Sequence, residues 1–77
     1  MTEYLVKDFF IEKHRAAGLD FDTDLFSGVF IDSLFAFEMV SYLEETFAIR
    51  IPDSEINENN FRTIRLIADM IRRIKGE

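Results

Sequence analysis

The sequence predicts an all-α domain of four helices, with a long loop between the first two helices and a short third helix. Three stretches carry apolar side chains at spacings of three to four residues, the period of an amphipathic helix. Residues typical of helix caps stand at the ends of these stretches, and one Pro and three Asn interrupt the chain between the last two. The chain is expected to form a single domain, 1–77, because 77 residues leave no room for a second one. Its hydrophobic content of 48%, with nine Phe, is enough for this domain to fold alone.

The first helix is expected over residues 3–17. Thr2 is a favourable N-cap, and Gly18 is typical of the residue that follows a helix. The apolar stripe of this helix is predicted to consist of Leu5, Val6, Phe9, Phe10 and Ala17.

Residues 18–31 form a connection whose length is unusual in a small domain and typical of functional loops. Asp20, Asp22 and Asp24 superficially resemble the start of a calcium-binding loop. Such a loop needs Gly at its sixth position and Glu at its twelfth, where this chain has Leu25 and Ile31, so calcium binding of that type is excluded. The loop is instead predicted to be held to the core by Leu19, Phe21, Leu25, Phe26 and Phe30.

The second helix is expected from Ser33 to about Phe47, with Asp32 as its N-cap. Ser33 then lies in the first turn, where a phosphate ester is favoured by the unpaired N–H groups and the positive end of the helix dipole. Leu34, Phe35 and Phe37 supply more apolar surface than one stripe requires, which favours a binding patch. The inward stripe is predicted to be Ala36, Met39, Val40, Leu43 and Phe47.

The rest of the chain is expected to contain an extended stretch, a short turn and a final helix. Residues 48–52 alternate in polarity, residues 53–55 favour a helical turn, and Ile56 is expected to point inward. Asn57, Asn59 and Asn60 favour irregular backbone, so the third helix is predicted to be short. Thr63 is expected to cap the last helix and Gly76 to end it. The inward stripe of that helix is Ile64, Ile67, Ala68, Ile71 and Ile74.

Charge and composition exclude several functions. The net charge is −6, and between residues 20 and 60 only Arg50 opposes ten acids, so this segment repels nucleic acid and suits either plain solvation or a basic protein partner. The absence of Cys excludes disulfides and thiolate metal sites, and His14, the only His, does not support a metal site. No apolar run is long enough to span a membrane and no leader pattern is visible, so a cytoplasmic protein is expected.

The start of the second helix carries the most specific pattern, Gly28-x-x-x-Asp32-Ser33-Leu34. In an acidic helical domain of this size, it resembles the signature of the acyl and peptidyl carrier protein family. The likeness extends to Leu25-Phe26 before the motif, and to Leu43-Glu44-Glu45-Thr46-Phe47 and Ile49-x-Ile51-Pro52 after it.

This resemblance implies an acyl-carrier type of four-helix bundle that carries cargo and is not an enzyme. Ser33 would receive 4′-phosphopantetheine from coenzyme A through a phosphopantetheinyl transferase, assisted by Asp32. The prosthetic thiol would hold an acyl or aminoacyl group as a thioester, between a loading enzyme and an acyl-accepting enzyme. The carrier is expected to be monomeric. The resemblance and the residue pattern together place partner docking on Leu34, Phe35, Phe37, Glu38, Ser41, Glu44, Glu45 and Ile51.

The type of carrier and two other functions remain open. Phe35, Phe37 and the Asn60-Phe61-Arg62-Thr63-Ile64 entry into the last helix look more like a free-standing dedicated carrier, either of the D-alanyl type or from polyketide or nonribosomal peptide pathways. The alternatives are a housekeeping fatty-acid carrier, or an unmodified adaptor that binds partners through Leu34, Phe35 and Phe37. A hydrolase with a Ser33 nucleophile is disfavoured because His14 is the lone candidate base.

Overall fold

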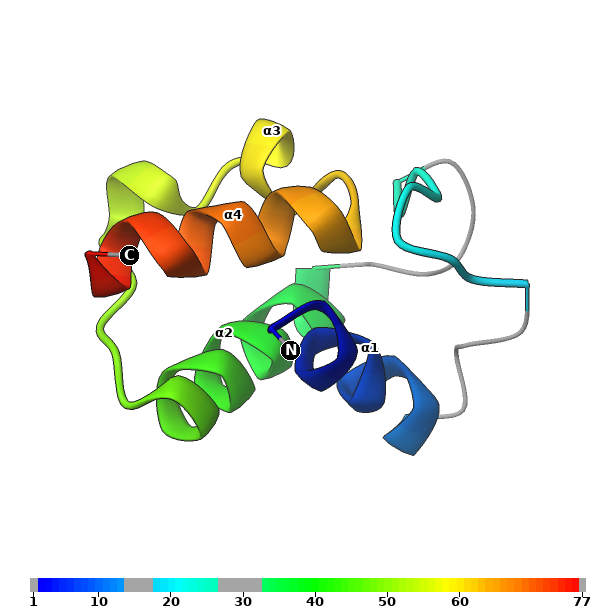
Figure 1. Ribbon diagram of the computed structural model, residues 1–77, viewed down its shortest axis with the longest axis horizontal. Coiled ribbons are helices and arrows are strands. Elements are labelled where there is room, and N and C mark those ends of the chain that lie inside the picture. The colour runs from blue at the N-terminus through cyan, green and yellow to red at the C-terminus, as the bar shows by residue number, and fades with distance from the viewer. Residues whose placement is uncertain (1, 14–17, 27–32, 77) are drawn as a thin grey trace.

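The structure, a computed structural model, describes residues 2–13, 18–26 and 33–76 (Figure 1). Its elements are α1 (Thr2–Glu12), α2 (Ser33–Phe47), a 3₁₀ turn η1 (Asp53–Glu55), α3 (Glu58–Phe61) and α4 (Ile64–Lys75). α4 packs against α1 and α3, and α1 also packs against α2. The predicted all-α fold of four helices with a short third helix is therefore confirmed.

α1 ends earlier than the sequence predicts. The helix stops at Glu12 and Lys13 lies in a turn, although its N–H still donates to the Phe9 carbonyl at 3.1 Å. The rest of the expected extension, residues 14–17, lies outside the described residues, and so do His14 and Ala17. Within the predicted stripe Val6, Phe9 and Phe10 are buried, whereas Leu5 is 40% exposed.

The inward face of α2 is rotated from the predicted one. Phe35, Met39 and Leu43 are buried at a spacing of four residues, while the predicted stripe members Ala36 and Val40 are only half-buried. Phe35 is the reason, because its ring packs 5.0 Å from the Phe9 ring and 5.3 Å from the Phe10 ring, between centroids. Aromatic pairs at such separations stabilise a core beyond the area they bury. α2 therefore turns Phe35 inward.

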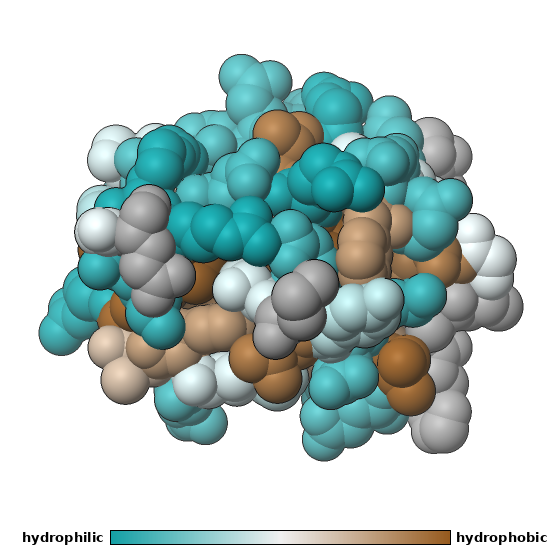
Figure 2. All heavy atoms as spheres, viewed as in Figure 1, coloured by the Kyte–Doolittle hydropathy of each residue, from teal (hydrophilic) through white to brown (hydrophobic). Residues whose placement is uncertain are grey.

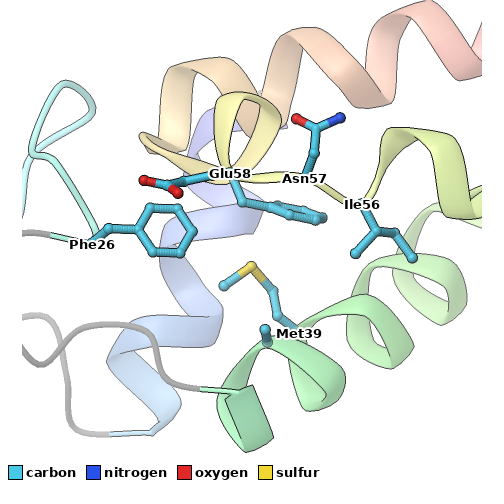
Figure 3. A pocket seen from close by; sticks show the side chains of 7 residues that line it. Phe26, Met39, Ile56, Asn57 and Glu58 are labelled. Carbon is cyan, nitrogen blue, oxygen red and sulfur yellow. The ribbon is translucent and has the colours of Figure 1, made fainter.

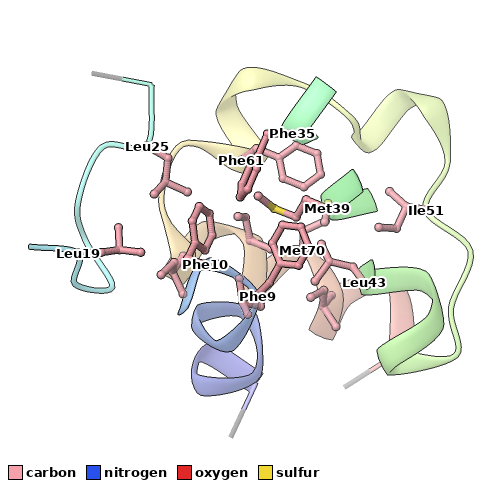
Figure 4. Close-up of a cluster of buried hydrophobic side chains, with 14 residues drawn as sticks. Phe9, Phe10, Leu19, Leu25, Phe35, Met39, Leu43, Ile51, Phe61 and Met70 are labelled. Atoms are coloured by element: carbon pink, nitrogen blue, oxygen red, sulfur yellow. The ribbon is translucent and has the colours of Figure 1, made fainter. Parts of the chain in front are cut away.

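The buried core joins the helices to the long loop (Figure 4). Leu19 and Leu25 of the loop are 5% and 0% exposed, which confirms the prediction that they hold the loop to the core. Phe21 is partly buried, Phe26 is 37% exposed, and Phe30 lies outside the described residues.

The region between α2 and α4 contains the clearest correction in secondary structure. The predicted turn at 53–55 is present as η1, but a helical turn, α3, forms where three Asn favour irregular backbone. Asn57 makes this possible because its side-chain oxygen accepts a hydrogen bond from the Asn60 N–H at 2.9 Å, as an N-cap does. Ile56, predicted to point inward, is 40% exposed.

α4 follows the prediction at both ends. Thr63 accepts a hydrogen bond from the Leu66 N–H at 3.0 Å, and Gly76 ends the helix with a φ of 81°. Four members of the predicted stripe are buried, namely Ile64, Ile67, Ala68 and Ile71, and the fifth, Ile74, is partly buried. Met70, which the prediction omitted, is buried as well.

Four arginines of α4 and its entry form an arginine row that ties other elements together. Arg62 pairs with Asp24 at 3.2 Å and Arg65 with Asp22 at 2.8 Å, so both hold the loop.

The other two arginines of the row hold η1 and α1. Arg73 pairs with Glu55 of η1 at 3.1 Å, and Arg72 pairs with Glu3 of α1 at 2.6 Å. The hydrogen bond from Arg72 holds the pKa of the Glu3 carboxyl below its ordinary value. The upper part of the face in Figure 2, where Figure 1 places α3 and α4, is accordingly dominated by hydrophilic residues.

Candidate functional site

Ser33 is the first residue of α2, as the sequence predicts. The first turn of any helix leaves backbone N–H groups without intrahelical acceptors, and these groups carry the positive end of the helix dipole. α2 has no acidic residue in that first turn to compensate the dipole. Asp32 and Gly28 lie outside the described residues, so the expected N-cap is not placed.

Five of the predicted docking residues share one side of α2, which we call the outward face: Leu34, Phe37, Glu38, Ser41 and Glu45. Their spacing of three or four residues stacks them along the helix. Leu34 and Phe37 are 71% and 73% exposed, which is unusual for such large apolar side chains. The outward face is therefore apolar near Ser33 and acidic toward the C-terminal end of α2.

Two predicted docking residues are buried instead. Phe35 is 3% exposed because it packs on the aromatic rings of α1, and Ile51 is 4% exposed within the same core. Neither side chain can form the surface expected of it. The apolar patch predicted from three residues is thus reduced to Leu34 and Phe37.

The predicted docking acids differ in what they contact. Glu44 is half-buried, and its Oε2 accepts a hydrogen bond from the Ile51 N–H at 2.9 Å, so it fastens the segment that follows α2. Glu38 pairs with Lys13 at 3.1 Å on the surface. No sequence pattern predicts this contact of Glu44, because its partner is a backbone group seven residues away.

Two hollows lie beside α2 on the side that faces η1 and α3. The α2–α3 pocket has a volume of about 190 Å³ and is lined by Phe26, Ala36, Met39, Ile56, Asn57, Glu58 and Phe61 (Figure 3). The α2–η1 groove has a volume of about 660 Å³ and is lined by Ala36, Phe37, Val40, Glu44, Arg50, Ile51, Asp53 and Ile56. They share Ala36 and Ile56, and Ala36 is three residues from Ser33. The sequence does not identify Phe26 and Ile56 as pocket residues, because their apolar side chains predict packing into the core.

These features fit a group attached to the hydroxyl of Ser33. A phosphate at the start of α2 meets the helix dipole with a favourable sign, and the two hollows begin about one helical turn away. The chain has no Cys, so any thiol used by this protein has to come from an attached group. None of the described helices is long and apolar enough to cross a membrane.

Comparison with known proteins points to the same chemistry. Residues 11–71, well over half of the chain, match a family model described as the phosphopantetheine attachment site. The chain is 30% identical over 67 residues to a D-alanyl carrier protein of Lactobacillus delbrueckii subsp. bulgaricus. The matched residues make up 82% of this chain and 84% of that protein. It is 33% identical over 59 residues to a probable acyl carrier protein, PigG, of a Serratia species, covering 77% and 68%. A D-alanyl carrier protein of Streptococcus pyogenes is 33% identical over 54 residues, covering 70% and 68%.

Proposed function

The chain belongs to the phosphopantetheine-dependent carrier proteins, which are not enzymes, and on this premise we propose that Ser33 is its attachment residue. The position of Ser33 at the start of α2 is the observation that carries the proposal. Modification forms a bond between the Ser33 Oγ and the phosphate of the arm and breaks the pyrophosphate bond of coenzyme A, so the nucleotide part leaves and the hydroxyl proton is released. The arm supplies the thiol on which an acyl or aminoacyl group is held as a thioester.

The residues of this chain would present and stabilise the arm rather than react with its cargo. The first turn of α2 offers N–H groups and a positive dipole to the phosphate diester. Asp32 keeps its proposed role in assisting the transferase. The arm then allows one cargo to reach several active sites at a high effective concentration.

The outward face of α2 is the proposed docking surface for the transferase, the loading enzyme and the acyl-accepting enzyme. Leu34 and Phe37 expose large apolar side chains next to Ser33, and Glu38 and Glu45 add negative charge one to three turns along. Exposed apolar anchors with a charged surround are typical of interface centres. The cytoplasmic location and the monomeric state expected from the sequence are part of this proposal.

Among carriers, we favour a dedicated type that serves D-alanyl transfer or a secondary-metabolite pathway over a housekeeping fatty-acid carrier. The relatives support this choice, since they are named as D-alanyl carriers and as the probable acyl carrier PigG. Phe35 and Phe37, just after Asp32-Ser33-Leu34, support it as well, because aromatic residues at this point resemble dedicated carriers more than fatty-acid carriers.

Intact mass spectrometry tests the attachment. Incubation with coenzyme A and a broad-specificity phosphopantetheinyl transferase is expected to add the mass of one phosphopantetheinyl group. Ser33→Ala is expected to abolish the gain, whereas Ser54→Ala, a matched control at an exposed serine of η1 outside the outward face, is expected to preserve it. No gain in the wild-type chain, under conditions that modify a known carrier, would refute the proposal.

The adaptor alternative is retained because Leu34 and Phe37 are exposed. It predicts that partner binding in extracts of the native cell survives Ser33→Ala and is lost in Phe37→Asp. The carrier function predicts that thioester loading is lost in Ser33→Ala, so the two functions are separated by the same pair of variants.

A further inference from the structure

Phe26, the last loop residue described before α2, lies at the rim of the α2–α3 pocket and is held there from three directions. Its own N–H donates to Asp24 Oδ1 at 3.0 Å, and the N–H of the preceding Leu25 donates to the Arg62 carbonyl at 2.7 Å. The Arg62 guanidinium lies 6.0 Å from the centre of the Phe26 ring, a distance typical of a cation–π contact.

The Arg62 guanidinium is held by two ion pairs, so its position beside the Phe26 ring is well defined. The guanidinium pairs with Asp24 of the loop at 3.2 Å and with Glu58 of α3 at 2.8 Å. Glu58 lines the same pocket, and Figure 3 shows its carboxylate close to Phe26 at the end of the pocket opposite Ile56. Asp24, Arg62 and Glu58 form a clamp that keeps the Phe26 ring in place as the end wall.

The floor of this pocket is firm and its volume is small. Met39 and Phe61 are 1% and 5% exposed, so the pocket cannot deepen without disturbing the core. An apolar cavity of roughly 150 Å³ holds one benzene molecule. The volume of about 190 Å³ therefore suits an apolar group of about six carbons while Phe26 stays in place.

We propose that Phe26, held by the Asp24–Arg62–Glu58 clamp, limits the size of the cargo that this carrier can shelter. The α2–α3 pocket accepts a short apolar acyl group, and the Phe26 ring closes the end of the pocket opposite Ile56, so a longer chain cannot extend past this ring. This inference depends on the proposed function, since the cargo reaches the pocket on an arm attached to Ser33. Ala36, on the pocket wall, is three residues from that attachment point.

The test uses chain length as its variable. The transferase loads the wild-type chain and Phe26→Ala with acetyl, butyryl, hexanoyl, octanoyl and decanoyl coenzyme A, and intact mass confirms each product. Cleavage of each thioester by hydroxylamine is then followed by mass, because a sheltered thioester reacts more slowly. Each methylene that becomes buried is expected to favour the sheltered state about fourfold.

The wild-type chain is expected to gain protection up to hexanoyl and none beyond it. Phe26→Ala is expected to continue gaining protection through octanoyl and decanoyl, and Phe26→Tyr to restore the limit. Arg62→Gln should relax the limit in part, whereas Arg65→Gln, which breaks the pair with Asp22 on the same loop, should leave it unchanged. Ile11→Ala, at an exposed apolar residue away from the pocket, controls for the loss of an apolar side chain elsewhere on the surface.

Separate results would overturn the inference and the proposed function. The size limit would be refuted if protection of the thioester rose through decanoyl in the wild-type chain, or if it depended on acyl length in the same way in wild type and Phe26→Ala. The carrier function would still stand in either case, because the mass gain shows that the arm is attached. If Phe26→Ala fails to fold, the comparison of Arg62→Gln with Arg65→Gln decides, because equal length profiles for these two variants would refute the clamp. No mass gain with any coenzyme A thioester would refute the carrier function itself.

Discussion

Phe35 and Phe37 stand two residues apart on α2 and should respond to truncation in opposite ways. Phe35 is 3% exposed and contacts two aromatic rings of α1, whereas Phe37 is 73% exposed. Replacing a buried Phe with Ala costs ~3–5 kcal/mol, through lost burial and the cavity left behind. Replacing an exposed side chain changes stability by only about 0.5 kcal/mol or less. Phe35→Ala should therefore be strongly destabilising and Phe37→Ala nearly neutral.

The size of the Phe35 effect compares with the stability of the whole domain. At roughly 0.05–0.15 kcal/mol per residue, a chain of 77 residues has about 4–12 kcal/mol of unfolding free energy. Phe35→Ala would remove a large share of it, so Phe35→Leu, which keeps more of the volume, provides a milder second variant. Urea unfolding followed by circular dichroism measures the loss for each protein, provided that the slope with urea stays constant.

The same pair also separates folding from partner contact. Phe37→Ala is expected to raise the KM of the transferase for this chain while the urea midpoint stays at the wild-type value, because its side chain lies on the outward face. A loss of less than about 1 kcal/mol for Phe35→Ala, or equal losses for both variants, would refute the assignment of Phe35 to the core.

Two further predictions concern a backbone position and an ion pair. Ala48 follows α2 with a φ of 54°, in the left-handed region that favours Gly, and the adjacent Ile49 N–H donates to the Glu44 carbonyl at 3.1 Å, as in a Schellman end. Ala48→Gly should raise the free energy of unfolding by up to about 1 kcal/mol, and the urea midpoint should rise with it. An unchanged or lower midpoint would show that Ala48 is not strained. Arg72 lowers the pKa of Glu3 in the folded state. The pair therefore contributes fully to the stability of the fold above the ordinary pKa of 4.5, and this stability is lost as the pH falls through the lower folded pKa. Glu3→Gln should therefore weaken the fall in stability with acid, measured as urea midpoints between about pH 6 and pH 3, and a curve with the wild-type slope would exclude this role.

The parts of the fold that depend on local signals were predictable from sequence. Thr63 and Gly76 define α4 because an N-cap and a left-handed C-cap act within a few residues of the chain. The start of α2 at Ser33 belongs to the same class, and so does the placement of Leu34 and Phe37 on an exposed surface.

The errors arise where a contact distant in sequence decides. Phe35 and Ala36 are both apolar, so periodicity alone did not determine which of them faces the core, and the rings of α1 settle the question. Asn57 is an exception, because its cap hydrogen bond with the Asn60 N–H spans only three residues, and Asn is a favourable N-cap that local reasoning can identify. The roles of Glu44 and Phe26 depend on partners on other segments, which no local pattern reveals.

The arginine row also shapes the electric field that a partner meets at a distance. Its four guanidinium groups neutralise carboxylates of the loop, of η1 and of α1, while α2 carries three acids and no basic residue. The helix that begins at Ser33 thus adds only negative charge to this field, with Glu38 partly balanced by Lys13. A positively charged body diffusing nearby is turned toward that helix before any atoms touch, and added salt shortens the range over which this orientation acts.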